Sequence, residues 1–392
     1  MNRGTTIFAQ VMDYVDYREF RRIAHAHHTG HRKYRFSCWE QFLCMVFAQL
    51  TYREGLRDIE SCLRSVGSKL YHVGIRSTVS HSTLAYANEH RPWQIYRDVA
   101  LSLIARARTL YRDERFVTEL EAAVYALDAT NIELCLKLYP WAKAHNYIKS
   151  SAGIKLHTLL DVNSHLPVFA RVSEANLREM CILDELLFEP GAFYILDRGY
   201  MSFARLKKID AARAFFVIRG KKGLRFNRVA SASVDKSQGI RLDQKIQLVV
   251  PLSLEGYPDC LRRIRYFDAE KERSFIFLTN NFALDALTIT ELYRSRWQIE
   301  LFFKWIKQHL RIKAFYGTTL NAVNTQVWIA LATFVLVAIV KKELKLNESL
   351  YTILQILSVT LFQKEPLNQV LTASHVPNEP SCDCNQLSLF HL

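Results

Sequence analysis

The stretch from residue 291 to residue 310, ELYRSRWQIELFFKWIKQHL, constrains the fold more than any other part of the chain. Its apolar residues recur every three or four positions, at Leu292, Ile299, Phe302, Phe303, Ile306 and Leu310. At about 100° per residue, these side chains fall on one side of an α-helix. The spacing therefore predicts one amphipathic helix over 291–310 that packs its apolar side against a core.

Four polar residues border that apolar side and form a column. Tyr293, Arg296, Glu300 and Lys307 fall within an arc of about 60° on the helical wheel. A charged column on a helix is usually a solvated face. Here the residue types favour a site, because the spacing Tyr-(2)-Arg-(3)-Glu-(6)-Lys resembles the YREK signature of the DDE transposases of bacterial insertion sequences, in the family named after insertion sequence four.

This resemblance implies a role for each residue of the column. Glu300 would be the third carboxylate of a two-metal site. Tyr293, Arg296 and Lys307 would contact phosphates of the transposon end near the scissile bond. Such a site also requires two aspartates upstream.

Two aspartates do stand upstream, in segments with a strand-like period. Asp128 lies in the block LDAT (127–130) and Asp197 in the block LDRGY (196–200), which resemble the first-aspartate and DRGY blocks of the same family. An aspartate at a strand end is more often a turn or cap residue than a catalyst. With the column at 291–310, however, the two blocks form a consistent triad. We predict strands at 121–138, 153–162, 166–172 and 192–197, with a helix at 178–188.

Three strands, a helix, a strand and further helices is the order of the ribonuclease-H-like fold. We therefore expect an α/β protein with a ribonuclease-H-like catalytic core. By resemblance, it would carry a mainly β insertion domain and an all-α N-terminal domain that binds the terminal inverted repeats. The expected ranges are 1–115 for the helical domain, 116–219 and 283–345 for the core, 220–282 for the insertion and 346–392 for a helical region with a loose tail.

The N-terminal region has helical periodicity from residue 39 to residue 90. Its short helices have a basic and polar face and could place one helix in a DNA groove, as a helix-turn-helix does. An ordinary helical bundle explains the same pattern equally well. The residues of that face are Arg76, His81, Tyr86, Asn88 and His90.

The net charge of +14 and the sequence pI near 9.4 suit a polyanionic partner, either nucleic acid or an anionic membrane surface. The sequence shows no basic amphipathic helix with an aromatic face, the pattern that would favour binding to a membrane surface. The longest apolar run, 327–340, fits a buried helix better than a membrane span. Residues 1–20 lack a signal-peptide pattern, so we expect a cytoplasmic, nucleoid-associated protein with reduced cysteines.

A basic loop follows the predicted core strands. Lys221, Lys222 and Arg225 suit phosphate binding, although a solvated hairpin tip is equally consistent with them. Arg198, next to Asp197, joins this set of candidate DNA contacts.

Three carboxylates with no nearby Cys or His favour Mg²⁺ over zinc. The resemblance implies two Mg²⁺ ions, which Mn²⁺ could replace, held by Asp128, Asp197 and Glu300. Asp128 would bridge both ions. Such a pair can serve both hydrolysis and strand transfer.

The expected partners are the terminal inverted repeats, target DNA and a second copy of the chain in a synaptic complex. The peptide Gln386-Leu387-Ser388-Leu389-Phe390 also resembles the segment with which many bacterial proteins bind the replication sliding clamp. An active transposase is the leading hypothesis. The alternatives are a nuclease of the same fold without strand transfer and a catalytically silent regulator that binds terminal repeats.

Overall fold

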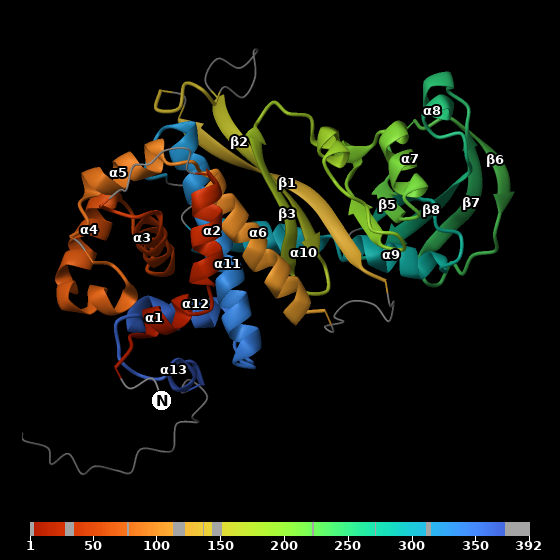
Figure 1. Cartoon of the computed structure of the whole chain (residues 1–392). Helices are drawn as coiled ribbons and strands as arrows, with labels where there is room; N and C mark the ends of the chain where they lie inside the picture. The colour runs from red at the N-terminus through yellow and green to blue at the C-terminus, as the bar shows by residue number, and fades with distance from the viewer. Residues whose placement is uncertain are drawn as a thin grey trace, which may run out of the picture.

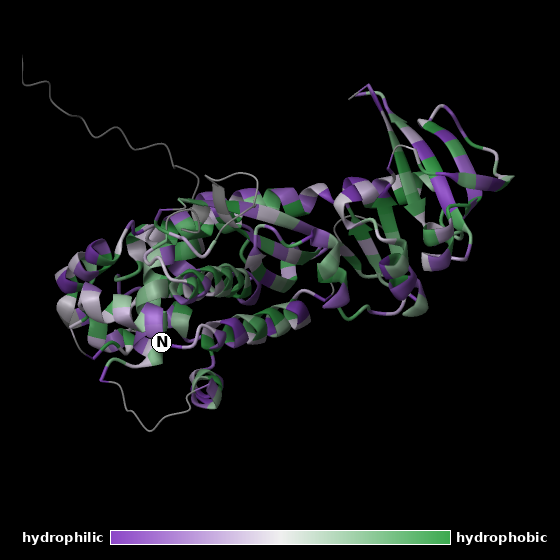
Figure 2. Ribbon diagram, turned by 90° about the horizontal axis from the view of Figure 1, so that it is seen from above, coloured by the Kyte–Doolittle hydropathy of each residue, from purple (hydrophilic) through white to green (hydrophobic). Residues whose placement is uncertain are grey.

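The computed structural model describes residues 4–27, 35–76, 78–112, 122–135, 137–142, 151–221, 223–270, 272–310 and 315–372. These residues form an elongated molecule with a helical unit at one end and the outer strands of a β-sheet at the other (Figure 1). The view from above shows the same order of parts (Figure 2).

One sheet runs through the molecule, in the order β3-β2-β1-β4-β5-β9-β8-β7-β6. Strand β1 is antiparallel to β2 and parallel to β4, and β4 is parallel to β5. This is the ribonuclease-H-like arrangement, and it confirms the expected fold class. The strands are β1 (Val124–Cys135), β2 (Ser151–Asp161), β3 (Leu166–Glu174), β4 (Phe193–Leu196), β5 (Phe215–Arg219), β6 (Phe226–Ser231), β7 (Ile240–Leu248), β8 (Leu261–Asp268) and β9 (Arg273–Thr279).

The middle of the sheet is buried on both faces. Strand β4 is the continuous apolar run FYIL, as expected for a parallel strand with both faces covered. Alternate residues of β1 enter different cores: Ala126 joins the core under α10 and α11, and Leu127 joins the core under α7.

The segment predicted as a β insertion continues this sheet. Strand β5 pairs antiparallel with β9, and β8, β7 and β6 follow in antiparallel order. Hydrophilic and hydrophobic residues alternate along these outer strands (Figure 2). The β-rich part is therefore linked to the core by an unbroken ladder of backbone hydrogen bonds.

The helices gather mainly at the other end of the sheet. The α-helices are α1 (Ile7–Met12), α2 (Tyr17–His27), α3 (Cys38–Leu50), α4 (Leu56–Ser65), α5 (His81–His90), α6 (Gln94–Leu110), α7 (Phe203–Ala211), α8 (Pro251–Gly256), α9 (Ala286–Arg294), α10 (Trp297–His309), α11 (Leu320–Glu343), α12 (Leu350–Thr360) and α13 (Leu367–Thr372). The 3₁₀ helices are η1 (Gly67–Val73), η2 (Glu179–Asp184) and η3 (Arg198–Tyr200).

Helix α11 links the helical unit to α10, where the ring centres of Phe334 and Phe302 lie 5.3 Å apart. It contacts α3, α5, α6 and α12. Among the described residues it alone is long and apolar enough to cross a membrane, but its most apolar window is completely buried in the fold. We conclude that its hydrophobicity serves packing.

The prediction of one helix over 291–310 was wrong, because the structure divides this stretch into α9 and α10. At the junction the hydroxyl of Ser295 donates to the carbonyl of Leu292, and the amide of Arg296 donates to the carbonyl of Tyr293. These i→i−3 bonds tighten the turn and redirect the chain.

Two smaller predictions also need correction. The helix expected at 178–188 is only the short 3₁₀ helix η2. The first strand ends at Cys135 rather than at residue 138, since residues 137 and 138 lie in a turn.

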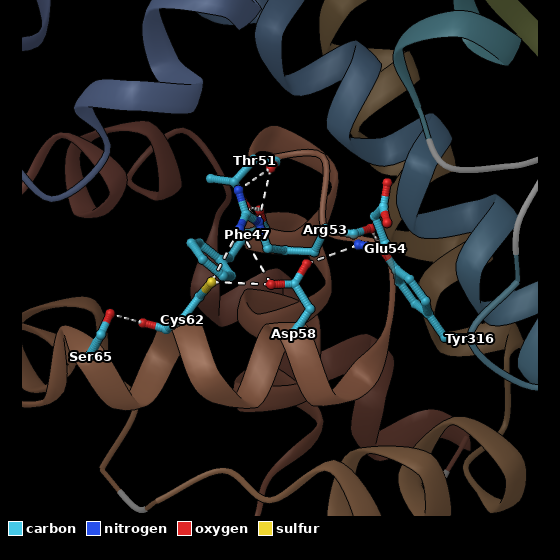
Figure 3. A network of polar contacts seen from close by, with 8 residues as sticks. All are labelled: Phe47, Thr51, Arg53, Glu54, Asp58, Cys62, Ser65 and Tyr316. Atoms are coloured by element: carbon cyan, nitrogen blue, oxygen red, sulfur yellow. Dashed lines mark hydrogen bonds and ion pairs between the residues drawn. The ribbon is translucent and has the colours of Figure 1, made fainter.

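A polar network joins the helical unit to the segment that follows α10 (Figure 3). Arg53 donates to the backbone carbonyl of Thr51 at 2.9 Å, to the thiol of Cys62 at 3.1 Å and to Asp58 at 3.4 Å. The carbonyl of Arg53 accepts from the hydroxyl of Tyr316 at 2.7 Å. The loop after α3 is thereby held against the catalytic core.

The ion pair between Arg262 and Asp243 stabilises the outer strands. It is nearly buried, and its Nη2–Oδ2 distance is 2.7 Å. We predict that Asp243→Ala lowers the free energy of unfolding by about 3–5 kcal/mol, because it leaves a buried guanidinium without its carboxylate. Urea unfolding measures this. Asp259→Ala removes the exposed pair with Lys207 and should cost less than about 1 kcal/mol. Equal losses in the two variants would contradict the prediction.

Candidate functional site

The two predicted aspartates lie at the same end of the sheet. Leu127 of β1 pairs with Leu196 of β4 in parallel register. Asp128 and Asp197 are the next residues on these neighbouring strands. Parallel pairing therefore brings the two carboxylates together.

Arg296 connects Asp128 to the third predicted carboxylate. Its Nη1 donates to Oδ2 of Asp128 at 2.9 Å, and its Nη2 donates to Oε1 of Glu300. The guanidinium is mostly buried. Arg296 therefore holds the start of α10 against the end of the β1–β4 pair.

Tyr293 reaches the remaining aspartate from α9. Its hydroxyl donates to Oδ1 of Asp197 at 3.1 Å. Burial raises the pKa of the Tyr293 phenol, and the Asp197 charge raises it as well. The phenol thus remains a neutral hydrogen-bond donor. Sequence spacing alone brought Tyr293, Arg296 and Glu300 into one column; in the structure Tyr293 and Arg296 each contact an aspartate, and Glu300 contacts Arg296.

Lys307 lies farther along α10 and contacts β1. Its Nζ donates to the backbone carbonyl of Asn131 at 2.8 Å. It therefore belongs to the same surface as the carboxylates, about two helical turns from Glu300.

Burial perturbs the Asp128 carboxyl. It is the largest cause that raises the pKa of Asp128, from 3.8 to about 6. The charges of Asp197 and Glu179 act in the same direction, and Arg296 opposes them. The negative charge of Asp128 is thus poorly solvated, which favours a bound cation beside it.

Sequence analysis missed a fourth carboxylate, Glu179 of η2. A Cβ atom built on Gly199 would lie 2.7 Å from Oε2 of Glu179, so a larger residue at 199 would displace that carboxylate. Lys155 pairs with Glu179 at 3.3 Å. Glu179 falls in the predicted helix 178–188, but nothing in the local pattern places it near Asp128; that proximity depends on the tertiary fold.

Tyr200 was also missed, although it belongs to the LDRGY block. Its side chain is fully buried, and its hydroxyl has no hydrogen-bond partner among the described residues. Asp128, Glu179 and Asp197 are close enough for their charges to raise the pKa of Tyr200, with burial as the largest cause. The Tyr200 phenol is therefore a neutral hydrogen-bond donor near the carboxylates of Asp128, Glu179 and Asp197.

The donor chemistry of this site fits a divalent ion that prefers oxygen ligands. Asp128, Asp197 and Glu300 offer carboxylate oxygens, and the hydroxyl of Tyr200 is a buried polar atom without a partner. Within the described ranges, no three His, Cys, Asp or Glu side chains form a ready metal cluster. The reason is visible at Arg296, whose cationic group takes the place between Asp128 and Glu300.

The other predicted DNA contacts lie on the surface. Arg198, Lys221 and Arg225 are exposed, and none of them bonds to the carboxylates. Lys222 and the peptide Gln386–Phe390 lie outside the described residues.

The structure corrects the expected DNA face of α5. Asn88 is buried, and its side-chain oxygen accepts from Gln41 at 2.7 Å, so it is not a surface residue. His81 is held by Glu60, with 2.6 Å between Nδ1 and Oε2. Tyr86 and His90 are exposed and stacked, with ring centres 4.0 Å apart.

A ribonuclease-H-like sheet with one acidic residue within β1, a second directly after β4 and a third on a late helix is typical of a class of nucleic-acid phosphotransferases. A family model described as the transposase DDE domain matches residues 119–336, more than half of the chain. A second model, described as a domain of unknown function, matches residues 3–76.

Proteins with similar sequences are also named as transposases. A protein of Sinorhizobium fredii named as transposase y4zB is 29% identical over 317 residues, which are 79% of this chain and 86% of that protein. A protein of Geobacillus stearothermophilus, named as a transposase for insertion sequence element IS5377, is 28% identical over 65% of this chain and 66% of its own length. The chain belongs to the DDE transposases of bacterial insertion sequences.

Among solved structures, the cryo-EM structure of the piggyBac transposase synaptic complex with hairpin DNA aligns with 95% of this chain and 80% of that chain. The TM-score is 0.46 and the sequence identity is 9%.

We predict a pH-dependent difference in stability between the wild-type protein and Asp128→Asn, both in EDTA. The folded-state pKa of Asp128, about 6, lies above its ordinary value of 3.8, so the folded state binds the proton more tightly. Wild-type stability therefore falls as the pH rises from about 4 to 6. The neutral Asn avoids this loss, so the difference in unfolding free energy between the two proteins should shift toward the variant by about 3 kcal/mol from pH 4 to above pH 6. Urea unfolding from pH 4 to 7 tests it, and a constant difference would contradict the raised pKa.

Proposed function

We propose that this transposase binds the terminal inverted repeats of its insertion sequence and catalyses metal-dependent DNA cleavage and strand transfer. The observation that carries the proposal is the contact set of Arg296 and Tyr293, which joins Asp128, Asp197 and Glu300 at one end of the sheet. Carboxylates from distant segments of the chain thus lie around one buried cation, an arrangement that also suits divalent cations.

Asp128, Asp197 and Glu300 are the proposed metal ligands. Two Mg²⁺ ions, or Mn²⁺ in their place, would supply a nucleophile, neutralise charge on the phosphoryl oxygens and stabilise the leaving oxygen. The poorly solvated charge of Asp128 would be compensated by such ions.

The cationic residues and Tyr293 are the proposed phosphate contacts. Arg296 presents a planar fork that suits two phosphate oxygens, and Lys307 presents a point charge beside β1. Tyr293 adds a neutral donor. The remaining candidates, at the surface and in the basic loop, are Arg198, Lys221, Lys222 and Arg225.

Two transposon ends must be held together for cut-and-paste movement, so the proposed active form is a homodimer on DNA. Four further statements remain predictions of this proposal. They are membership of the YREK group, location at the nucleoid, contact with the sliding clamp through Gln386–Phe390, and the division of the chain into domains. The proposed domains are residues 1–115, 116–219 with 283–345, 220–282 and 346–392.

We predict that Glu300→Gln abolishes cleavage of a duplex that carries the terminal repeat and its flank, because the amide is a poorer metal ligand. The expected loss is about 100-fold or more, with repeat binding unchanged. Labelled duplexes are incubated with Mg²⁺ or EDTA and resolved on denaturing gels. Glu291→Gln, an exposed change on α9, is the matched control and should cleave normally.

Other outcomes would favour the alternatives to an active transposase. Metal-dependent nicking without joined products would support a nuclease. Tight repeat binding by the wild-type protein without cutting under any metal would support a silent regulator. Loss of binding in Glu300→Gln would show that Glu300 is structural.

We also predict that Lys307→Ala weakens binding to the terminal repeat and lowers the slope of log K against log salt concentration by about 1, the value for one lost phosphate contact. Fluorescence anisotropy between 50 and 200 mM salt measures this. An unchanged slope would remove Lys307 from the phosphate contacts.

A further inference from the structure

Two arginines that have no assigned role lie over neighbouring aromatic rings beside the site. Arg219 ends β5, and its guanidinium carbon is 5.1 Å from the ring centre of Phe275. Arg294 ends α9, and its guanidinium carbon is 5.1 Å from the ring centre of Tyr266, whose hydroxyl it also contacts. Tyr266 and Phe275 are directly paired across β8 and β9. Both arginines therefore lie on the same face of the sheet.

A row of rings connects this pair to the carboxylates. The rings of Phe275 and Phe277 are stacked, with an interplanar angle of 3° and 6.2 Å between centres. Phe277 lies 4.6 Å from the ring centre of Tyr293, which donates to Asp197. The charge of Arg219 also opposes the burial that raises the pKa of Tyr293, so Arg219 lies near that phenol.

The stacking fixes the two guanidinium groups without neutralising them. Neither Arg219 nor Arg294 forms an ion pair with any carboxylate among the described residues, whereas Arg262 on the same sheet pairs with Asp243. A guanidinium with one face on a ring keeps N–H groups at its edge for another acceptor. Arg294 is exposed and Arg219 is half-buried.

Shielding of the rings from water is the simpler explanation, since long cationic side chains often cover apolar surface. It accounts for the faces of the guanidinium groups but, apart from the contact of Arg294 with the Tyr266 hydroxyl, gives no acceptor to their N–H donors. Two unpaired, oriented cations beside an acidic site, in a chain with a net charge of +14, match a polyanion that passes from that site across the sheet.

We propose that Arg219 and Arg294 form a phosphate track, which binds backbone phosphates of DNA as it leaves the carboxylates and crosses the face of β9 and β8. This inference rests on the proposed function, because it takes DNA as the ligand. The contacts are to the backbone, so the track positions DNA without reading its sequence.

The test uses the full-length protein with Arg219→Ala and Arg294→Ala combined. Fluorescence anisotropy gives the affinity for a duplex with the terminal repeat and for an unrelated duplex between 50 and 200 mM salt. Loss of two phosphate contacts should lower the slope of log K against log salt concentration by about 1.8. If only the repeat duplex responds, the track binds the transposon end; if the unrelated duplex responds as well, it binds any duplex, target DNA included.

Arg241→Ala is the matched control. Arg241 lies 5.2 Å from the ring centre of Phe267, which follows Tyr266 on β8 and so faces the opposite side of the sheet. The substitution removes an exposed, ring-stacked arginine from the same sheet. The slope of log K against log salt concentration should not change. An equal effect of Arg241→Ala would overturn the track, because the loss would then reflect total charge.

A second double variant, Arg219→Lys with Arg294→Lys, keeps both charges and covers the case in which the alanine variant does not fold. We expect an unchanged salt slope with affinity reduced about fivefold, since a lysine lacks the stacked fork. Wild-type affinity in this variant, or an unchanged slope in the folded alanine variant, would overturn the track and leave the proposed function intact. Failure of the wild-type protein to bind either duplex would instead overturn the proposed function.

Discussion

The contact of Arg296 with Asp128 and Glu300 is the interaction on which the site depends. Arg296 and Asp128 are 168 residues apart in the chain, and the ion pair holds the start of α10 against the middle of β1. Because the guanidinium is mostly buried, removal of both carboxylates would leave its charge without compensation. The same cation holds Asp128 and Glu300 together in the absence of metal. It therefore links the stability of the fold to the geometry of the candidate site.

The sheet extends this constraint to both ends of the molecule. On one side the antiparallel strands β9 to β6 continue from β5, so the face with the stacked arginines is rigidly related to the carboxylates. On the other side α11 packs against α3, α5 and α6. Asn321 of α11 donates to the backbone carbonyls of Asn88 and Arg91 at the end of α5. The helical unit and the catalytic end of the sheet thus share one continuous set of contacts.

Acidic and basic side chains are arranged differently around the site. Carboxylates gather beside the middle of β1 and the end of β4, where burial raises the pKa of Asp128. Cations surround them at Arg296, Lys307 and the stacked arginines. An acidic centre with a basic surround suits a ligand that is itself an anion and is processed with divalent cations.

Much of this could be predicted from the sequence, because hydrophobic period is a local property. The strand alternation around Asp128 and the buried run before Asp197 placed both aspartates at strand positions. The spacing of Tyr293, Arg296 and Glu300 placed them on one side of a helical stretch. What the spacing could not show was the break after Arg294, because it depends on the bonds of the 295–296 turn and on the distant partner Asp128.

The sequence by itself determined the residue types and their local order: two aspartates on strands, a Glu with Arg and Tyr at helical spacing, and a basic chain. Only the tertiary structure decided which groups meet. It placed Glu179 next to Gly199, buried Asn88, and set Arg219 and Arg294 over rings of β9 and β8. These outcomes depend on strand pairing and helix packing between distant segments, which no local period encodes.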